Sequence, residues 1–248
     1  MDATIRVAEV RASNGARWLG EAFRLFRQKP LAWIALSAGW LVITFGLLIV
    51  PIIGPAIANL MQPAFFASFA ITAYRQSAGE PVVMGDLFLG FRRNLRALVT
   101  LGFILLLAEI VIFAGMALMG LPMAPEGDKA TFTVAEYVSG HEWILAVGFL
   151  LSVIVKGALW FAPALIAFHA MSTTHAMRWS LYAALSNLGA MMVYGACLLG
   201  LLFAGALPYL LGILIVVPMM VISTYTGYRD VFEQTQAPGT HPGDAPPV

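Results

Sequence analysis

ALVTLGFILLLAEIVIFAGMALM occupies residues 97–119 and carries a single charged side chain, Glu109. About 20 predominantly apolar residues form a helix long enough to cross the hydrocarbon core of a bilayer. Five more stretches share this length and character, at residues 31–50, 56–74, 143–168, 187–206 and 209–228. We therefore predict an all-α, polytopic membrane protein with six transmembrane helices.

The composition agrees with this prediction. Hydrophobic residues make up 60% of the 248 residues and charged residues only 11%, whereas about 25% of the residues of a soluble domain are charged. We expect one transmembrane domain over residues 1–233 and a disordered, proline-rich tail over residues 234–248. Cys197 is the only cysteine, which excludes an intrachain disulfide and a CxxC metal site.

Basic residues gather on one side of the six predicted spans. That side holds twelve of them: Arg6, Arg11, Arg17, Arg24, Arg27, Lys29, Arg75, Arg92, Arg93, Arg96, Arg178 and Arg229. The opposite side holds Lys129 alone, among Glu126, Asp128, Glu136 and Glu142. The positive-inside rule then places both termini in the cytoplasm of a bacterium, with the spans in the inner membrane. Trp33 and Trp143 lie at predicted interfaces, where aromatic belts form.

Three amphipathic segments, here called elbows, precede the odd-numbered spans. The first sets Leu19, Ala22, Phe23 and Phe26 against Arg17, Glu21, Arg24 and Arg27. The second, capped by Asp86, sets Leu87, Phe88, Phe91, Leu95 and Leu98 against Arg92, Arg93 and Arg96. The third, about 175–186, has the weakest pattern, with Met177, Leu181 and Leu185 aligned. We expect helices lying in the cytoplasmic interface with these arginines towards the lipid headgroups; the alternative is ordinary loop helices packed on the bundle.

The elbows and spans repeat along the chain. An offset of 65 residues matches Phe23, Phe26 and Arg27 to Phe88, Phe91 and Arg92, and an offset of 93 matches Asn94 and Leu95 to Asn187 and Leu188. A Thr-x-Tyr-Arg string ends both the second and the sixth span, at 72–75 and 226–229. A unit of one elbow and two spans, at about 15–75, 84–170 and 172–230, would form a threefold parallel repeat.

Three motifs carry a resemblance: WLxxAFxxFxxxP at 18–30, DLFxGFRRN at 86–94 and WFAPALIA at 160–167. Over residues 15–232 the chain resembles an uncharacterised family of proteobacterial six-helix membrane proteins. More distantly, it is similar to the membrane domain of some bacterial glycerophosphodiester phosphodiesterases. No catalytic domain follows here, so the resemblance implies the architecture and an inner-membrane location, and no activity.

Glu109 and Lys156 are the two ionisable residues deep in the predicted spans. Each lies twelve residues from the cytoplasmic end of its span, and either charge alone costs about 3 kcal/mol at a helix centre. Equal depth and opposite sign predict an ion pair between neighbouring helices. The pair either fixes the helix register or relays protons or ions. Two other possibilities are a protonated Glu109 and a Lys156 that extends to the interface.

Asn59 and Gln62, one turn apart in the second span, form a polar patch. Such groups either join helices by hydrogen bonds or line a solute path. Pro163 and Pro218 interrupt two other spans, as in some transporters, although isolated prolines are common in membrane helices. His169 and His175 are six residues apart and do not share a helix face, so we expect no cofactor and no metal site.

No motif of an enzyme active site occurs in the sequence. We expect a multi-pass inner-membrane protein without enzymatic activity that organises lipids or partner proteins and binds no nucleic acid. The alternative is a small-solute or proton-linked transporter that uses Glu109, Lys156, Asn59 and Gln62. A water-accessible cavity reaching Glu109 would favour the transporter, and a dry, close-packed pair would favour the structural function.

Overall fold

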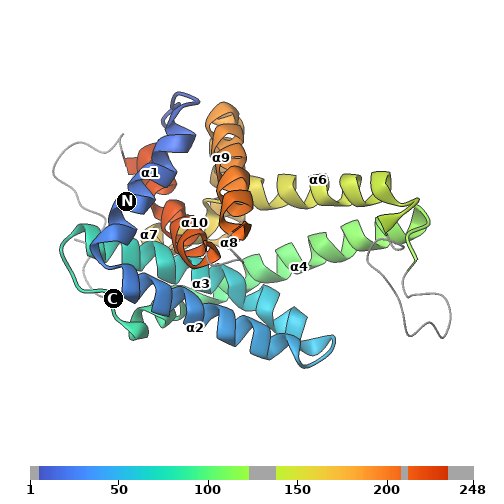
Figure 1. The fold of residues 1–248 in the computed structure, drawn as a ribbon, viewed down its shortest axis with the longest axis horizontal. Coiled ribbons are helices and arrows are strands. Elements are labelled where there is room, and N and C mark those ends of the chain that lie inside the picture. Colours follow the sequence, from blue (N-terminus) through green and yellow to red (C-terminus); the bar gives the residue numbers. More distant parts are fainter. Residues whose placement is uncertain (1–5, 123–137, 208–211, 234–248) are drawn as a thin grey trace.

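The computed structural model describes residues 6–122, 138–207 and 212–233 (Figure 1). The predicted tail and the charged residues at 126, 128, 129 and 136 lie outside the described residues. In the described ranges the chain is all-helical. The helices are α1 (Asn14–Gln28), α2 (Pro30–Leu48), α3 (Ile53–Ser77), η1 (Met84–Phe88), η2 (Gly90–Arg92), α4 (Leu95–Leu118), α6 (Glu142–Ala158), α7 (Ala162–His169), α8 (Thr173–Ser186), α9 (Leu188–Ala206), α10 (Ile213–Tyr228) and η3 (Arg229–Glu233).

Five segments among the described residues are long and apolar enough to cross a membrane: α2, α3, α4, α6 with α7, and α9. The sixth predicted span corresponds to α10, which has only 16 residues. A helix of that length measures about 24 Å, less than the hydrocarbon thickness of about 30 Å. The count of six spans therefore stays a prediction.

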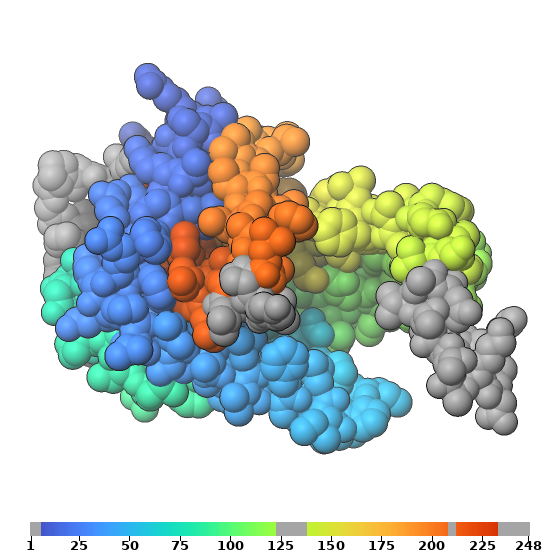
Figure 2. Space-filling view, in the orientation of Figure 1, coloured from blue at the N-terminus to red at the C-terminus, as the bar shows by residue number. Residues whose placement is uncertain are grey.

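The long helices form hairpins that diverge from a common base. Helix α4 packs along α6, α2 along α3, and α9 along α10. Figures 1 and 2 show the α4–α6 hairpin projecting as an arm away from the rest of the molecule. We call the end where α1, η1, η2, α7 and α8 gather the base, and the opposite ends of the hairpins the tips.

Burial is concentrated at the base. In α4 the buried residues are all in the first turns, from Ala97 to Gly102, and in α2 they are Trp33, Leu36 and Ser37. In α3 and α10, which run towards the base, the buried residues fill the last turns. The chain therefore has a compact core at one end, and its hairpins present mostly exposed apolar side chains beyond it.

Helix α1 packs with its apolar face against α9 and α10. Trp18, Ala22 and Phe26 are buried there. Gly15 allows the close approach, because a β-carbon at that position would overlap the backbone carbonyl of Ala190 in α9. For this elbow the structure shows the alternative arrangement, a helix packed on the bundle, in place of an apolar face turned towards lipid.

The second elbow is not a single amphipathic helix, so that prediction is wrong. Two short 3-10 turns, η1 and η2, take its place. Asp86 is not the N-cap that the sequence predicted, because it lies inside η1, whose N-cap is Val83. Its carboxylate accepts the backbone N–H of Val83 at 3.0 Å. Gly90 lies so close to α3 that its N–H donates to Ser68 Oγ at 2.8 Å, and Asn94 adopts a left-handed conformation with φ of 36°. These contacts hold the segment in short turns, although its apolar residues have the spacing of an amphipathic helix.

The fourth predicted span, 143–168, is broken between α6 and α7. Pro163 lies in the first turn of α7, where its missing N–H costs nothing. The break leaves the Phe161 N–H and the Ala158 carbonyl to be hydrogen-bonded by a side chain of α8. Ser180 Oγ accepts from the Phe161 N–H at 3.1 Å and donates to the Ala158 carbonyl at 2.8 Å. Pro218, by contrast, lies inside the continuous helix α10.

Trp33 is not an interfacial belt residue as predicted. It is fully buried, and its indole N–H donates to Gln76 Oε1 at 2.7 Å.

A second buried tryptophan has a similar hydrogen bond, because the indole N–H of Trp18 donates to Asp230 Oδ2 at 2.8 Å. Gln76 and Asp230 each follow the arginine of a Thr-x-Tyr-Arg string, so the two strings end in similar contacts with a buried tryptophan. Trp143 is exposed, as a belt residue requires.

Candidate intramembrane site

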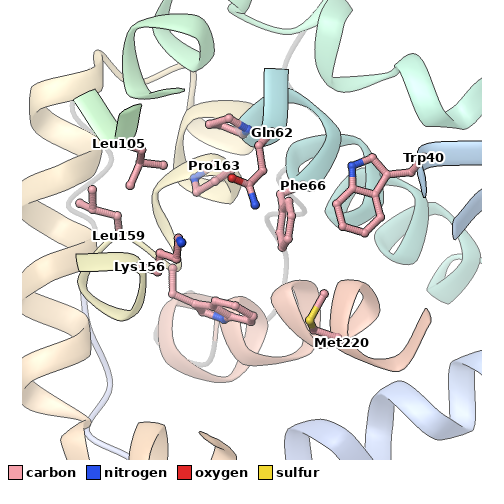
Figure 3. Close-up of a pocket in the computed structure, with 10 residues that line it drawn as sticks. Trp40, Gln62, Phe66, Leu105, Lys156, Leu159, Pro163 and Met220 are labelled. Atoms are coloured by element: carbon pink, nitrogen blue, oxygen red, sulfur yellow. The ribbon is translucent and has the colours of Figure 1, made fainter. Parts of the chain in front are cut away.

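A cavity of about 240 Å³ lies between the hairpins. It is lined from α2, α3, α4, α6, α7 and α10, so every hairpin contributes to its wall (Figure 3). Its lining residues are Trp40, Gln62, Pro63, Phe66, Leu105, Lys156, Leu159, Trp160, Pro163 and Met220. The break at 159–161 places Leu159 and Trp160 in this wall, which links the local backbone geometry to the shape of the cavity.

Aromatic rings form much of the wall. Phe66 lies edge-on to Trp40 with ring centroids 5.9 Å apart, and edge-on to Trp160 at 6.4 Å. Edge-to-face contacts of this kind fix the orientation of neighbouring rings. The cavity therefore has rigid apolar surfaces contributed by α2, α3 and the break after α6.

Two polar side chains, Gln62 and Lys156, enter this apolar wall. Figure 3 shows them reaching into the same space from different helices, α3 and α6. The structure thus brings together one member of each predicted polar pair. Asn59 is not part of the lining; its amide donates to the Pro55 carbonyl of its own helix at 3.0 Å.

Lys156 and Glu109 form an ion pair across the α4–α6 hairpin. Lys156 Nζ lies 2.9 Å from Glu109 Oε1, and Ser152 Oγ donates to Glu109 Oε2 at 3.1 Å. The Lys156 side chain is 55% exposed and that of Glu109 29%. The pair is consequently only partly buried: Glu109 has Lys156 as its ion-pair partner and Ser152 as a hydrogen-bond donor, and Lys156 also lines the cavity.

The five predicted interfacial arginines lie outside the cavity, exposed on the base. Arg24 approaches Glu21 at 3.6 Å, and the Arg27 guanidinium lies 5.7 Å from the centre of the Phe23 ring. Arg92, Arg93 and Arg96 are exposed around η2 and the start of α4. They carry the charge asymmetry of the base and do not take part in the site.

His169 and His175 do not come together. His169 Nε2 lies 2.6 Å from the hydroxyl of Tyr228, and His175 Nε2 accepts the indole N–H of Trp179 at 2.9 Å. Within the described ranges, no group of three metal-ligating side chains occurs.

Sequence reasoning missed most of the cavity wall. Trp40, Phe66 and Trp160 were not predicted as site residues, although Trp160 and Pro163 belong to the WFAPALIA motif at 160–167. The available signal was a tryptophan and a proline three residues apart near the cytoplasmic end of a predicted span, where a break and an inward-facing ring would coincide.

The chain is similar to a probable inner membrane protein of Burkholderia thailandensis, with 29% identity over 269 residues that cover 95% of this chain and 96% of the relative. No model of a protein family matches the sequence, and no solved structure matches it. The resemblance to glycerophosphodiester phosphodiesterase membrane domains stays a prediction. With five segments among the described residues able to span a bilayer and this relative, the chain is a helical multi-pass membrane protein.

Proposed function

We propose that this chain is a non-enzymatic protein of the bacterial inner membrane that holds a lipid-like amphiphile between its hairpins and so organises the surrounding lipid. The observation that carries the proposal is the cavity, whose wall is apolar except for Gln62 and Lys156. Small-molecule sites combine such a wall with a few polar groups that orient the ligand.

Charge indicates the kind of amphiphile. Glu109 neutralises Lys156, so an anionic ligand would add a net charge in a medium of low dielectric constant, which is unfavourable. The ammonium and the Gln62 amide still offer donors. An uncharged acceptor, such as an ester carbonyl of a lipid, meets these donors without leaving a charge unpaired.

Filling the cavity tests this function. Leu105→Trp places an indole in the cavity wall, and Leu107→Trp places the same indole two residues away on the exposed side of α4. Both variants would be purified in nanodiscs, and retained lipid would be counted by native mass spectrometry. We expect Leu105→Trp to lose the bound lipid and Leu107→Trp to keep it. Equal lipid content in both variants and the parent protein would contradict the proposal.

The proposal includes six spans with both termini in the cytoplasm. The twelve-to-one distribution of basic residues supports this topology. Reporter fusions after residue 234 should be active in the cytoplasm, and fusions within 122–142 in the periplasm. A periplasmic C-terminus would rule out the six-span topology.

We further propose that the units at 15–75 and 172–230 are repeats, supported by their shared Thr-x-Tyr-Arg strings at 72–75 and 226–229. The residue after each string, Gln76 or Asp230, accepts the indole N–H of a buried tryptophan. Trp33→Phe and Trp18→Phe each remove one indole donor. Similar losses of thermal stability are expected from the two variants; a loss in only one of them would argue against equivalence of Gln76 and Asp230, the residues that follow the two strings.

A further inference from the structure

Helix α8 is oriented with its small side chains inward and its large apolar ones outward. Ala176, Ser180 and Ala183 are buried where α8 packs against α7, α6 and α4. Leu181 and Leu185 are 45% and 63% exposed. A helix that covers a water-soluble core has the reverse arrangement, so the outward face of α8 needs an apolar environment.

This outward face leads directly into a membrane-spanning helix. Leu188 and Met192, at the start of α9, are exposed as well, and α9 is one of the candidate spans. The exposed apolar side chains of α9 face lipid if that helix crosses the bilayer. The C-terminal half of α8 therefore lies at the edge of the same lipid.

The N-terminal half of α8 has a different surface. His175, Arg178, Trp179 and Tyr182 line a hollow of about 460 Å³. Within the described part of the chain no carboxylate pairs with Arg178. Because Trp179 donates to His175 Nε2, the proton of a neutral His175 ring is on Nδ1, which remains a donor.

We propose that this hollow binds the phosphate headgroup of an anionic phospholipid. The guanidinium of Arg178 and His175 Nδ1–H donate to the phosphate oxygens, since arginine pairs with phosphate through two parallel hydrogen bonds. Trp179 and Tyr182 lie one turn further along, the level at which aromatic belts meet the interface. Leu181 and Leu185 contact the acyl chains. The unpaired positive charge selects an anionic lipid, and the site is independent of the cavity between the hairpins.

Helix α1 provides the contrast. It carries Arg24 and Arg27, but its apolar face is covered by α9 and α10. Arg24 also has a carboxylate neighbour in Glu21. Removing Arg24 therefore changes the net charge of the base as much as removing Arg178 does, without touching the proposed site.

The test compares Arg178→Gln with the matched control Arg24→Gln in the full-length protein. Short-chain phosphatidylglycerol and phosphatidylcholine would be titrated onto each purified protein, with binding measured by native mass spectrometry. We expect the parent protein to prefer phosphatidylglycerol, Arg178→Gln to bind it about fivefold more weakly, and Arg24→Gln to bind it unchanged. Equal losses in both variants, or none in Arg178→Gln, would overturn the proposal, and so would competition by inorganic phosphate at the same concentration as the lipid.

A second measurement does not depend on lipid affinity. In a Cys197→Ser background, spin labels at Leu185→Cys and Arg24→Cys would be compared in nanodiscs for contact with oxygen and with a water-soluble nickel chelate. We expect the label at 185 to favour oxygen and the label at 24 to favour the chelate. A label at 185 as accessible to the chelate as the one at 24 would place α8 in water and refute the site.

Discussion

The base and the outer parts of the hairpins are both rich in apolar side chains, but those of the base are buried and those of the hairpins are largely exposed. Trp18, Phe69 and Tyr228 are fully buried in the base, whereas Val111 and Phe149 on the α4–α6 hairpin are exposed. Among the five candidate spans, α3 has the lowest mean hydropathy and the largest buried share. In this chain, small and weakly polar side chains therefore mark the contacts between helices, while the most apolar surfaces remain exposed, as helices in contact with lipid require.

Polar groups reinforce the same contrast. In the buried half of α3, Ser68 and Thr72 hydroxyls donate to carbonyls four residues earlier, at 2.9 and 2.8 Å. At the base, Asp230 accepts from Asn14 at 2.7 Å and from the Trp18 indole at 2.8 Å, and it also pairs with Arg17. Between α4 and α6, the ion pair of Glu109 and Lys156 is partly open. Substitutions at the base should therefore cost more stability than substitutions in the hairpins.

The largest effect is expected at Asp230. Asp230→Ala removes the acceptor for Trp18 and Asn14 and the partner of Arg17, and it leaves the buried indole N–H of Trp18 unsatisfied, at a cost of about 3–4 kcal/mol. Thermal unfolding in detergent, followed by size-exclusion fluorescence, measures the change. Asp230→Asn keeps one acceptor oxygen and should lose less. A loss below about 1 kcal/mol for Asp230→Ala would show that the base does not depend on this carboxylate.

The next effect concerns the contact of α1 with α9. Gly15→Ala sets a β-carbon against the backbone of Ala190, and the helices must separate, at a cost of about 2–3 kcal/mol. The control is Gly20→Ala in the same helix, where the added methyl group meets no atom within 4 Å. We expect that control to be slightly stabilising, since alanine is the better helix former. If both variants melt at the same temperature, the close approach is not needed for stability.

A smaller effect is expected at the ion pair. Glu109→Gln and Lys156→Met each leave a partner charge between the helices, which costs about 1–2 kcal/mol because both side chains are partly exposed. The double variant should recover much of the loss, because a paired charge contributes little beyond an apolar replacement. Losses that simply add would show that the residues are uncoupled. A double variant that folds normally but abolishes a transport phenotype in cells would support the relay.

The smallest effect is expected in the outer part of α4. A methyl group added at Gly115 meets nothing within 4 Å, so Gly115→Ala should raise stability by about 0.5–1 kcal/mol through helix propensity alone. The same thermal unfolding assay detects it. A destabilised Gly115→Ala variant would mean that the hairpin has a close neighbour at this position, such as a second copy of the chain, and would weaken the contrast between base and hairpins.

The spacing of apolar residues predicted the first and third elbow helices and failed for the second. The pattern around Phe26 correctly placed an apolar helical face, yet a protein surface covers that face. The pattern around Phe91 failed, because Gly90 is held against Ser68 and the chain turns there. The weakest pattern, that of Leu181 and Leu185, belongs to the elbow with the most exposed large apolar side chains. A helical wheel shows which residues share a face and contains no information on what that face contacts.

The candidate site was predictable in part. Depth and charge placed Glu109 beside Lys156, and the structure sets them 2.9 Å apart. The inclusion of Gln62 with Lys156 in one cavity, and the exclusion of Asn59, depend on which faces of α3 and α6 turn towards the cavity. Contacts between residues distant in sequence, such as Phe66 with Trp160, form that cavity.

The apolar stretches alone are enough to establish that this chain is helical and crosses a membrane, because their lengths and their lack of charge leave lipid as the only suitable solvent. Which apolar faces meet protein and which remain exposed became clear from the packing of the helices, since a leucine or phenylalanine is equally suited to both. It also decided the break after α6, where Ser180 of α8 satisfies a backbone freed near Pro163. Such a long-range hydrogen bond has no local sequence signal, and it positions the wall of the cavity.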